Sequence, residues 1–201
     1  MKTAEEIFTA LEEKFGAKRE TLDKWSVTAI VSAGYLRNAV QFLKEDADVK
    51  LEMLVDIAGI DYLTYPNHEG PRFAVSYSFK SISNPGLRFR LKVLVSEECP
   101  KVPTLCDFYA NANWYEREVF DQFGIVFEGH PDLRRLLNHV EFVGHPLRKD
   151  YPAQKRQWLS TNDYLLPALE KRLEDLGYKV IQRSKEVGTN DNEFLEGSIK
   201  E

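Results

Sequence analysis

Cysteine is scarce in this sequence, and its scarcity limits the cofactors that the chain can hold by itself. The 201 residues include two cysteines, Cys99 and Cys106. Two thiols cannot supply the four thiolates of an iron–sulfur cluster or of a Cys₄ zinc site. They do not indicate a disulfide-rich secreted domain either, so a reducing compartment is expected. We expect both cysteines to be ordinary buried or half-buried thiols.

Long apolar runs and familiar catalytic motifs are absent as well. No window approaches the roughly 20 apolar residues of a spanning helix, and residues 1–6 lack the apolar run of a signal peptide. There is no GxGxxG motif, P-loop, nucleophile elbow or zinc-type Cys/His spacing. A membrane association is therefore expected to be indirect, through a partner protein.

Positive charge is in the minority, except in one stretch. The chain has 27 Lys and Arg against 32 Asp and Glu, a net charge of −5, which argues against a general nucleic-acid binder. Residues 130–160 reverse this balance, with 6 basic and 3 acidic side chains. Such a stretch is either a solvated face or a dock for an acidic partner surface, and both interpretations stay open.

The hydrophobic periodicity is typical of an α+β domain. Helical spacing is found in segments 4–15, 35–43, 104–109, 113–123 and 163–176. Alternating or continuous apolar patterns predict strands at 25–31, 51–60, 73–79 and 87–95, with a turn at 84–86 and a proline-marked linker at 97–103. This order predicts a two-layer sandwich of helices on a mixed, largely antiparallel sheet, followed by a helix–loop docking segment and an extended C-terminal arm.

We expect three parts along the chain. They are an α+β domain over 1–100, a signature helix with charged loops over 101–152, and a partly helical C-terminal extension over 153–201. Residues 183–201 are polar and poor in large apolar groups, which is typical of a mobile tail or of an arm that becomes ordered on a partner.

Acidic side chains and histidines are concentrated after residue 113, and two interpretations compete. Glu116, Glu118 and Asp121 could meet His130 or His145 around a metal ion or in acid–base chemistry. Glu116 and Glu118 diverge by about 200° on a helix, which is poor chelate spacing. We therefore favour ion pairs that hold the helix to the basic loops after it. A stand-alone metal-dependent enzyme using Glu118, Asp121 and His130 is the alternative.

This segment resembles the signature of the thirty-kilodalton subunit family of the respiratory NADH:quinone oxidoreductase, complex I, which includes the mitochondrial protein and its bacterial counterparts. The residues that carry the resemblance are Glu116, Arg117, Glu118, Asp121, Phe123, His130, Arg134, Leu136 and Leu137. Gln122 departs from the family pattern, which has an apolar residue there. Segments 144–152 and 56–62 also resemble the family.

The resemblance implies a non-catalytic hydrophilic subunit in the peripheral arm of a proton-translocating complex that passes electrons from NADH to quinone. FMN, iron–sulfur clusters and quinone are then expected on partner subunits, and no cofactor, metal or catalytic residue on this chain. The implied partners are the large quinone-site subunit and its cluster-bearing neighbours, at the cytoplasmic side of a bacterial inner membrane. The equivalent subunit of a membrane-bound hydrogenase-type complex is an alternative.

A set of polar and charged side chains is expected to face those partners. It consists of Glu116, Arg117, Glu118, Asp121, His130, Pro131, Arg134, Arg135, His145, Arg148, Lys149 and Tyr151.

Overall fold

The computed structural model describes residues 2–20, 27–66, 68–155, 157, 160 and 162–178. The chain divides into two compact units. The first comprises Met1–His139 and His145–Asp150, and the second comprises Val140–Gly144 and Tyr151–Glu201. The expected α+β class is confirmed, with helices packed on a mixed sheet.

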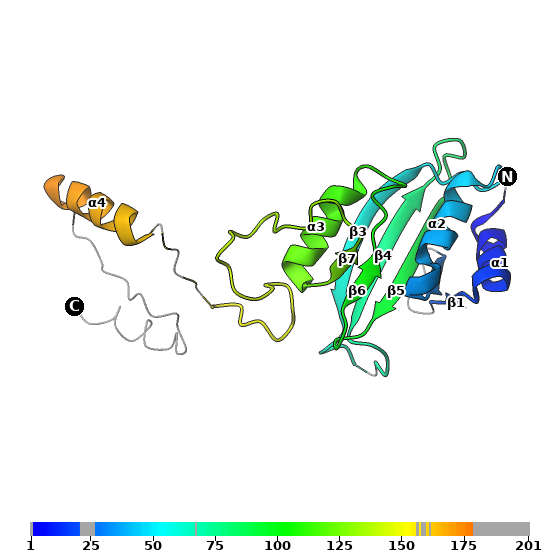
Figure 1. Ribbon diagram of the computed structural model, residues 1–201, viewed down its shortest axis with the longest axis horizontal. Coiled ribbons are helices and arrows are strands. Elements are labelled where there is room, and N and C mark those ends of the chain that lie inside the picture. Colours follow the sequence, from blue (N-terminus) through cyan, green and yellow to red (C-terminus); the bar gives the residue numbers. More distant parts are fainter. Residues whose placement is uncertain are drawn as a thin grey trace. The chain divides into compact units, whose positions relative to one another are not determined.

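A five-stranded sheet forms the centre of the first unit, in the order β1-β2-β5-β4-β3 (Figure 1). Its strands are β1 (Lys18–Arg19), β2 (Thr28–Val31), β3 (Met53–Asp61), β4 (Phe73–Lys80) and β5 (Arg88–Val95). β2 runs parallel to β5, and the other pairs are antiparallel. The strand expected at 25–31 is confirmed for its last four residues, and Trp25 lies outside the described residues.

The N-terminal helices form as their sequence signals predict. The Thr3 side chain accepts from the Glu6 backbone N–H while the Glu6 carboxylate accepts from that of Thr3, so a capping box starts α1 (Ala4–Phe15). Gly16, in the left-handed region, ends it. A short 3₁₀ turn, Ala33–Tyr35, leads into α2 (Leu36–Glu45). The apolar faces of both helices join one core with the sheet.

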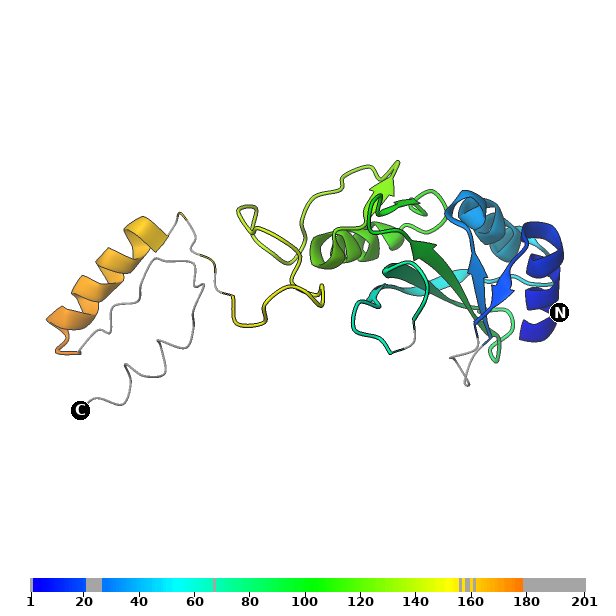
Figure 2. The same ribbon diagram turned by 90° about the horizontal axis from the view of Figure 1, so that it is seen from below.

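Three short strands were not foreseen: β1, β6 and β7. β6 (Lys101–Pro103) lies where a linker was expected, and it pairs in parallel with β7 (Val126–Glu128). The helix expected at 104–109 was also wrong: the Thr104 N–H donates to the Glu128 carbonyl and extends the strand pairing, so only a turn follows. α3 (Ala112–Phe123) then crosses between β6 and β7. Figure 2 shows α2 and α3 over the same side of the sheet.

The second unit contains α4 (Asn162–Asp175), which confirms the helix expected at 163–176. The tail expected at 183–201 lies outside the described residues. Among the described residues, no helix is both long enough and apolar enough to cross a membrane. Cys99 is exposed, contrary to expectation, because it lies in the turn before β6, whereas Cys106 is half-buried.

Gly59 of β3 is needed for the close contact between the sheet and α3. A Cβ atom at this position would lie 2.4 Å from Cδ2 of the Phe123 ring. We expect Gly59→Ala to lower the free energy of unfolding by about 1–3 kcal/mol, because the helix or the ring must shift. Chemical denaturation measures this. Gly34→Ala, where the added methyl meets no atom within 4 Å, is the matched control and should change stability by less than about 0.5 kcal/mol. Equal losses would contradict the argument.

Candidate functional site

The charged residues of α3 divide between the interior and the surface. Glu116 and Asp121 are fully buried and Arg117 nearly so, whereas Glu118 is exposed. The first three bind groups of their own unit. The sequence could not decide this, because each finds its partner in a loop outside the helix.

Asp121 organises the loop that follows β7. One carboxylate oxygen, Oδ2, accepts from the backbone N–H groups of Leu136, Leu137 and Asn138 at 2.8–3.1 Å. The other accepts from Nη1 of Arg135 at 2.7 Å and from the Asn138 amide at 3.1 Å. Burial raises the pKa of Asp121, but these donors outweigh it and lower the pKa to about 2. A charged Asp121 therefore holds the loop.

Other side chains fasten the same loops to α3. Nε and Nη2 of Arg117 donate to the carbonyls of Arg134 and Arg135 at 3.1 and 3.2 Å. Nδ1 of His145 donates to the Asp121 carbonyl at 3.0 Å. Burial, together with nearby arginines, lowers the pKa of His145, which favours the neutral ring. The expected ion pairing between α3 and the following loops is found at Asp121 and Arg135. Arg117 and His145 instead bind backbone carbonyls.

The end of α3 has to be glycine for this fastening to form. Gly124 has φ +74°, and a Cβ atom there would lie 2.5 Å from Nε2 of His145 and 2.6 Å from Nη2 of Arg148. Arg148 also donates through Nε to the Phe123 carbonyl at 2.6 Å. The loop therefore closes tightly over the helix C-terminus.

A second ion cluster, with Arg72 and Asp61 buried at its centre, lies where β3 ends. Arg72 binds both carboxylate oxygens of Asp61, at 3.0 and 3.1 Å, and also contacts Glu97 and Asp150. The Lys149 N–H donates to Asp61 at 2.8 Å. Burial raises the pKa of Asp61, but Arg72 and two backbone N–H groups outweigh it and lower that pKa. The cluster ties residues 149 and 150 to the sheet.

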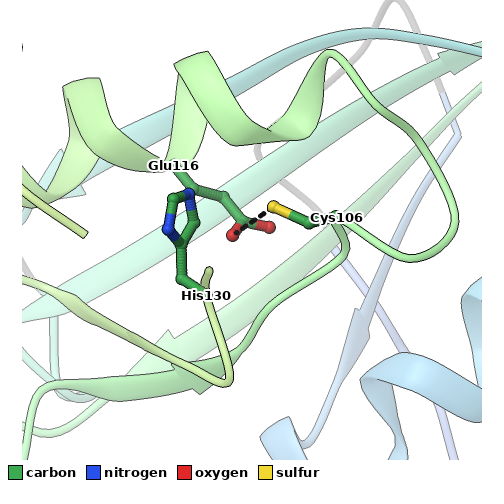
Figure 3. A group of neighbouring side chains, drawn as sticks. All are labelled: Cys106, Glu116 and His130. Carbon is green, nitrogen blue, oxygen red and sulfur yellow. Dashed lines mark hydrogen bonds between the residues drawn. The ribbon is translucent and has the colours of Figure 1, made fainter. Parts of the chain in front are cut away.

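A third polar group, Cys106 with Glu116 and His130, is drawn in Figure 3. Glu116 accepts from the Thr104 hydroxyl and the Leu105 N–H, both at 2.6 Å, and from the Cys106 thiol at 3.6 Å. Burial raises the pKa of Glu116, although Thr104 and Leu105 offset part of the effect. Burial also raises the pKa of Cys106, to about 11, so the thiol keeps its proton.

The structure does not assemble the alternative metal site. Among the described residues, the sole group of acids, histidines and cysteines close enough to hold an ion is Cys106 with Glu116 and His130. Glu118 is exposed on another side of α3, and both oxygens of Asp121 hold loop donors. The trio Glu118, Asp121 and His130 is therefore not a site.

The expected partner-facing set differs in accessibility. The exposed members are Glu118, Pro131, Arg134 and Lys149, and the half-buried ones are His130, Arg135, His145, Arg148 and Tyr151. Tyr151 belongs to the second unit, where its hydroxyl accepts from Gln157 and its ring stacks on Phe142. Sequence reasoning missed Asp61, Arg72 and Cys106, although Asp61 falls in a segment noted for its family resemblance.

Sequence reasoning also missed an aliphatic series between residues 137 and 147. Its members are Leu137, Val140, Val143 and Leu147, exposed by 64, 92, 68 and 52%. The signal was present: aliphatic residues recur in a stretch that has neither helical nor strand periodicity. Leu137 and Leu147 belong to the first unit, and Val140 and Val143 belong to the second. Both units thus expose large apolar side chains on irregular backbone, which is typical of interaction sites.

Comparison with known proteins identifies a matching family and similar proteins. The family described as "Respiratory-chain NADH dehydrogenase, 30 Kd subunit" matches residues 29–157. Two proteins named as NADH-quinone oxidoreductase subunits, from Burkholderia vietnamiensis (strain G4 / LMG 22486) and Burkholderia multivorans (strain ATCC 17616 / 249), are each 44% identical over 147 residues, covering 71% of this chain and 73% of theirs.

Two solved structures are also similar. A trypsin-resistant fragment (1-134) of Nqo5 is 37% identical, with a TM-score of 0.57, over 64% of this chain and 98% of that one. A chain of the membrane-bound sulfane sulfur reductase, an archaeal respiratory membrane complex, is 24% identical, with a TM-score of 0.59, over 90% of this chain and 95% of its own. The second likeness is one of fold alone.

Proposed function

This chain belongs to the family of the 30 kDa subunit of the respiratory-chain NADH dehydrogenase, and on that premise we propose that it is a non-catalytic, hydrophilic subunit of the peripheral arm of a proton-translocating NADH-quinone oxidoreductase. In this proposal it supports assembly and the neighbouring quinone-site and cluster-bearing subunits. FMN, iron–sulfur clusters and quinone bind to those partners. The chain reaches the cytoplasmic side of the inner membrane through them.

The aliphatic series between residues 137 and 147 is the observation that carries this proposal. Leu137 follows the backbone that Asp121 holds, so its exposed side chain is presented from a fixed loop. In the second unit, Gln157 binds both the N–H and the carbonyl of Val143 at 2.7 Å, which fixes that backbone too. Each unit thus presents exposed aliphatic side chains from a fixed backbone. Such side chains lose little entropy on docking, so they suit permanent assembly.

Exposed positive charge on the first unit supports the same proposal. Arg134 and Lys149 are exposed, and both lie in the basic stretch 130–160 of an otherwise acidic chain. Exposed basic side chains favour a partner with an acidic surface, because opposite charges steer and orient the encounter.

We expect the double change Val140→Asp with Val143→Asp to reduce co-purification with the other complex subunits at least about tenfold, since two carboxylates would have to lose water in the interface. The variant should fold normally, because both side chains are mainly exposed. Tagged chain is purified from membranes of its own cells, and the bound subunits are quantified by mass spectrometry.

The matched control is Ile82→Asp, which alters an equally exposed aliphatic residue (66%) in the turn between β4 and β5. It should assemble as the unaltered chain does. If the double variant assembles fully, or if Ile82→Asp fails equally, the proposed docking surface is wrong.

The equivalent subunit of a membrane-bound hydrogenase-type complex is the second candidate. The archaeal chain of similar fold, from a membrane-bound sulfane sulfur reductase, supports the fold and does not favour this candidate. The same purification distinguishes the two. Co-purified NADH-oxidising and cluster-bearing subunits support the first candidate, and hydrogenase-type subunits support the second.

A further inference from the structure

The Cys106–Glu116–His130 cluster is built by the carboxyl ends of two parallel strands. β6 ends at Pro103, and Cys106 follows in the next turn. β7 ends at Glu128, and His130 follows after Gly129. Gly129 has φ +83°, which turns the chain sharply at this point. Glu116 comes from α3, which crosses between the two strands. Three elements that are separated in sequence thus deliver one ligand atom each.

We propose that these three side chains form a binding site for Zn²⁺, with Cys106 Sγ, a Glu116 carboxylate oxygen and a ring nitrogen of His130 as protein ligands. All three ligand atoms lie within 4.8 Å of one another. Thiolate, carboxylate and imidazole are the three side-chain groups that zinc takes in proteins, and three of them leave a fourth position for water.

The separation of the first two ligand atoms already fits a bound ion. Zinc–sulfur and zinc–oxygen bonds of about 2.3 and 2.0 Å at a tetrahedral angle place sulfur and oxygen about 3.5 Å apart. In the structure, Cys106 Sγ and Glu116 Oε2 are 3.6 Å apart. The ion would take the place of the thiol proton in this hydrogen bond, and the proton would leave to solvent.

The surroundings hold the ligands in place. Glu116 Oε1 accepts from the Leu105 N–H and Oε2 from the Thr104 hydroxyl, so the carboxylate is oriented before an ion arrives. The His130 ring lies between the Asn113 carbonyl, 3.2 Å from Nε2, and the Asp132 N–H, 3.0 Å from Nδ1. Coordination through Nδ1 would replace the contact from the Asp132 N–H and leave Nε2–H donating to the Asn113 carbonyl. Coordination through Nε2 would cost both contacts, because the ring proton would have to move to Nδ1. A sulfur ligand favours zinc over magnesium or calcium, which take oxygen ligands.

Zinc is compatible with a subunit that takes no part in electron transfer, because the ion has no redox chemistry. Its effect would be to join the turn after β6, the loop after β7 and α3 through one centre. The inference does not depend on the proposed place in the respiratory complex, and the chain can be tested alone.

The purified full-length chain is reduced, loaded with ZnCl₂, passed through gel filtration and measured for metal content. We expect one zinc per chain. With Co²⁺ as the probe, we expect a thiolate-to-cobalt charge-transfer band, which reports a cysteine ligand directly. Cys106→Ser should abolish the band, and His130→Gln should weaken zinc binding more than about 100-fold, beyond the usual cost of losing an outer hydrogen bond.

Cys99→Ser and His68→Gln are the matched controls, since both residues lie outside the cluster. Both variants should bind zinc as the unaltered chain does. Circular dichroism of each metal-free variant checks folding, and His130→Gln decides the case if Cys106→Ser does not fold. Substoichiometric zinc in the unaltered chain, a band that survives Cys106→Ser, or equal losses in the controls would each overturn the site. The cluster would then be a hydrogen-bonded support only.

Discussion

Replacing Asp121 by alanine is expected to lower the free energy of unfolding by about 3–5 kcal/mol, as the loss of one partner from a buried ion pair typically does. The change leaves the Arg135 guanidinium without this carboxylate and removes the acceptor of three backbone N–H groups. Buried donors without acceptors are costly because they lose water and gain nothing. Denaturation with urea, monitored by circular dichroism, measures the loss.

Hydrogen exchange tests the proposed cause. Relative to the unaltered chain, Asp121→Ala should increase the exchange rates of the N–H groups of Leu136, Leu137 and Asn138 more than those of the β4 amides. The reason is that the shared acceptor of these three groups is gone. Glu118→Ala is the matched control, an exposed acid on the same helix, and should change stability by less than about 0.5 kcal/mol. Unchanged protection at residues 136–138 would contradict the role assigned to Asp121.

The same carboxylate gives the chain a defined acid sensitivity. The pKa of Asp121 is about 2 in the folded chain against an ordinary 3.8, so its ionised form favours folding. Its contribution to the free energy of unfolding, about 2 kcal/mol, is fully present above the ordinary pKa. The contribution is lost as the pH falls from about 4 toward 2. Acid denaturation should show the corresponding loss in the unaltered chain and less of it in Asp121→Ala.

The elements that sequence reasoning predicted correctly are those whose signals are local. The helix at 4–15 has a capping box, a regular apolar face and a terminal glycine, all within fourteen consecutive positions from Thr3 to Gly16. The segments predicted as strands, 73–79 and 87–95, place a large apolar residue at every second position of the sequence, and they form β4 and β5. In both cases a short window contains all the information, because the periodicity repeats several times.

β6 and β7 could not be foreseen for the opposite reason. Each has three residues, too few to show a period, and β6 ends on Pro103. Their pairing joins Lys101 to Val126 across the whole of α3. Tertiary packing decides which short strands pair in parallel. A local window of sequence contains only one of the two strands, so it cannot reveal the pairing.

The candidate site shows the same division between local and distant information. Helical spacing placed Glu116 and Asp121 beside an apolar face, but it could not name their partners. Those partners are Thr104 and Leu105 before the helix and residues 135–138 after it. The sequence does not distinguish a carboxylate that holds backbone N–H groups from one that faces a partner. Either role can be filled by the same residue type at the same helical spacing.

Replacing Arg72 by methionine is expected to lower the free energy of unfolding by about 3–5 kcal/mol, since it leaves a fully buried carboxylate on Asp61 without its cation. Methionine keeps much of the apolar volume, so the loss reports charge more than packing. Arg19→Met is the matched control. Arg19 makes the same two-bond contact with Glu5, at 2.6 and 2.7 Å, but both side chains are at least half exposed. Its loss should cost less than about 1 kcal/mol.

The loss of unfolding free energy in Arg72→Met should depend on pH if its cause is lost charge pairing, and should not if its cause is lost packing. Arg72 lowers the pKa of Asp61 and of Asp150, so both carboxylates favour the folded state only while they are ionised beside it. Without the cation, the two acids should bind protons more readily in the folded chain. The gap in stability between Arg72→Met and the unaltered chain should therefore narrow as the pH falls below about 4, because the unaltered chain then loses the same contribution. Urea denaturation at a series of pH values measures the gap. A deficit independent of pH would indicate that Arg72 acts through packing, and that residues 149 and 150 are held to the sheet by something other than its charge.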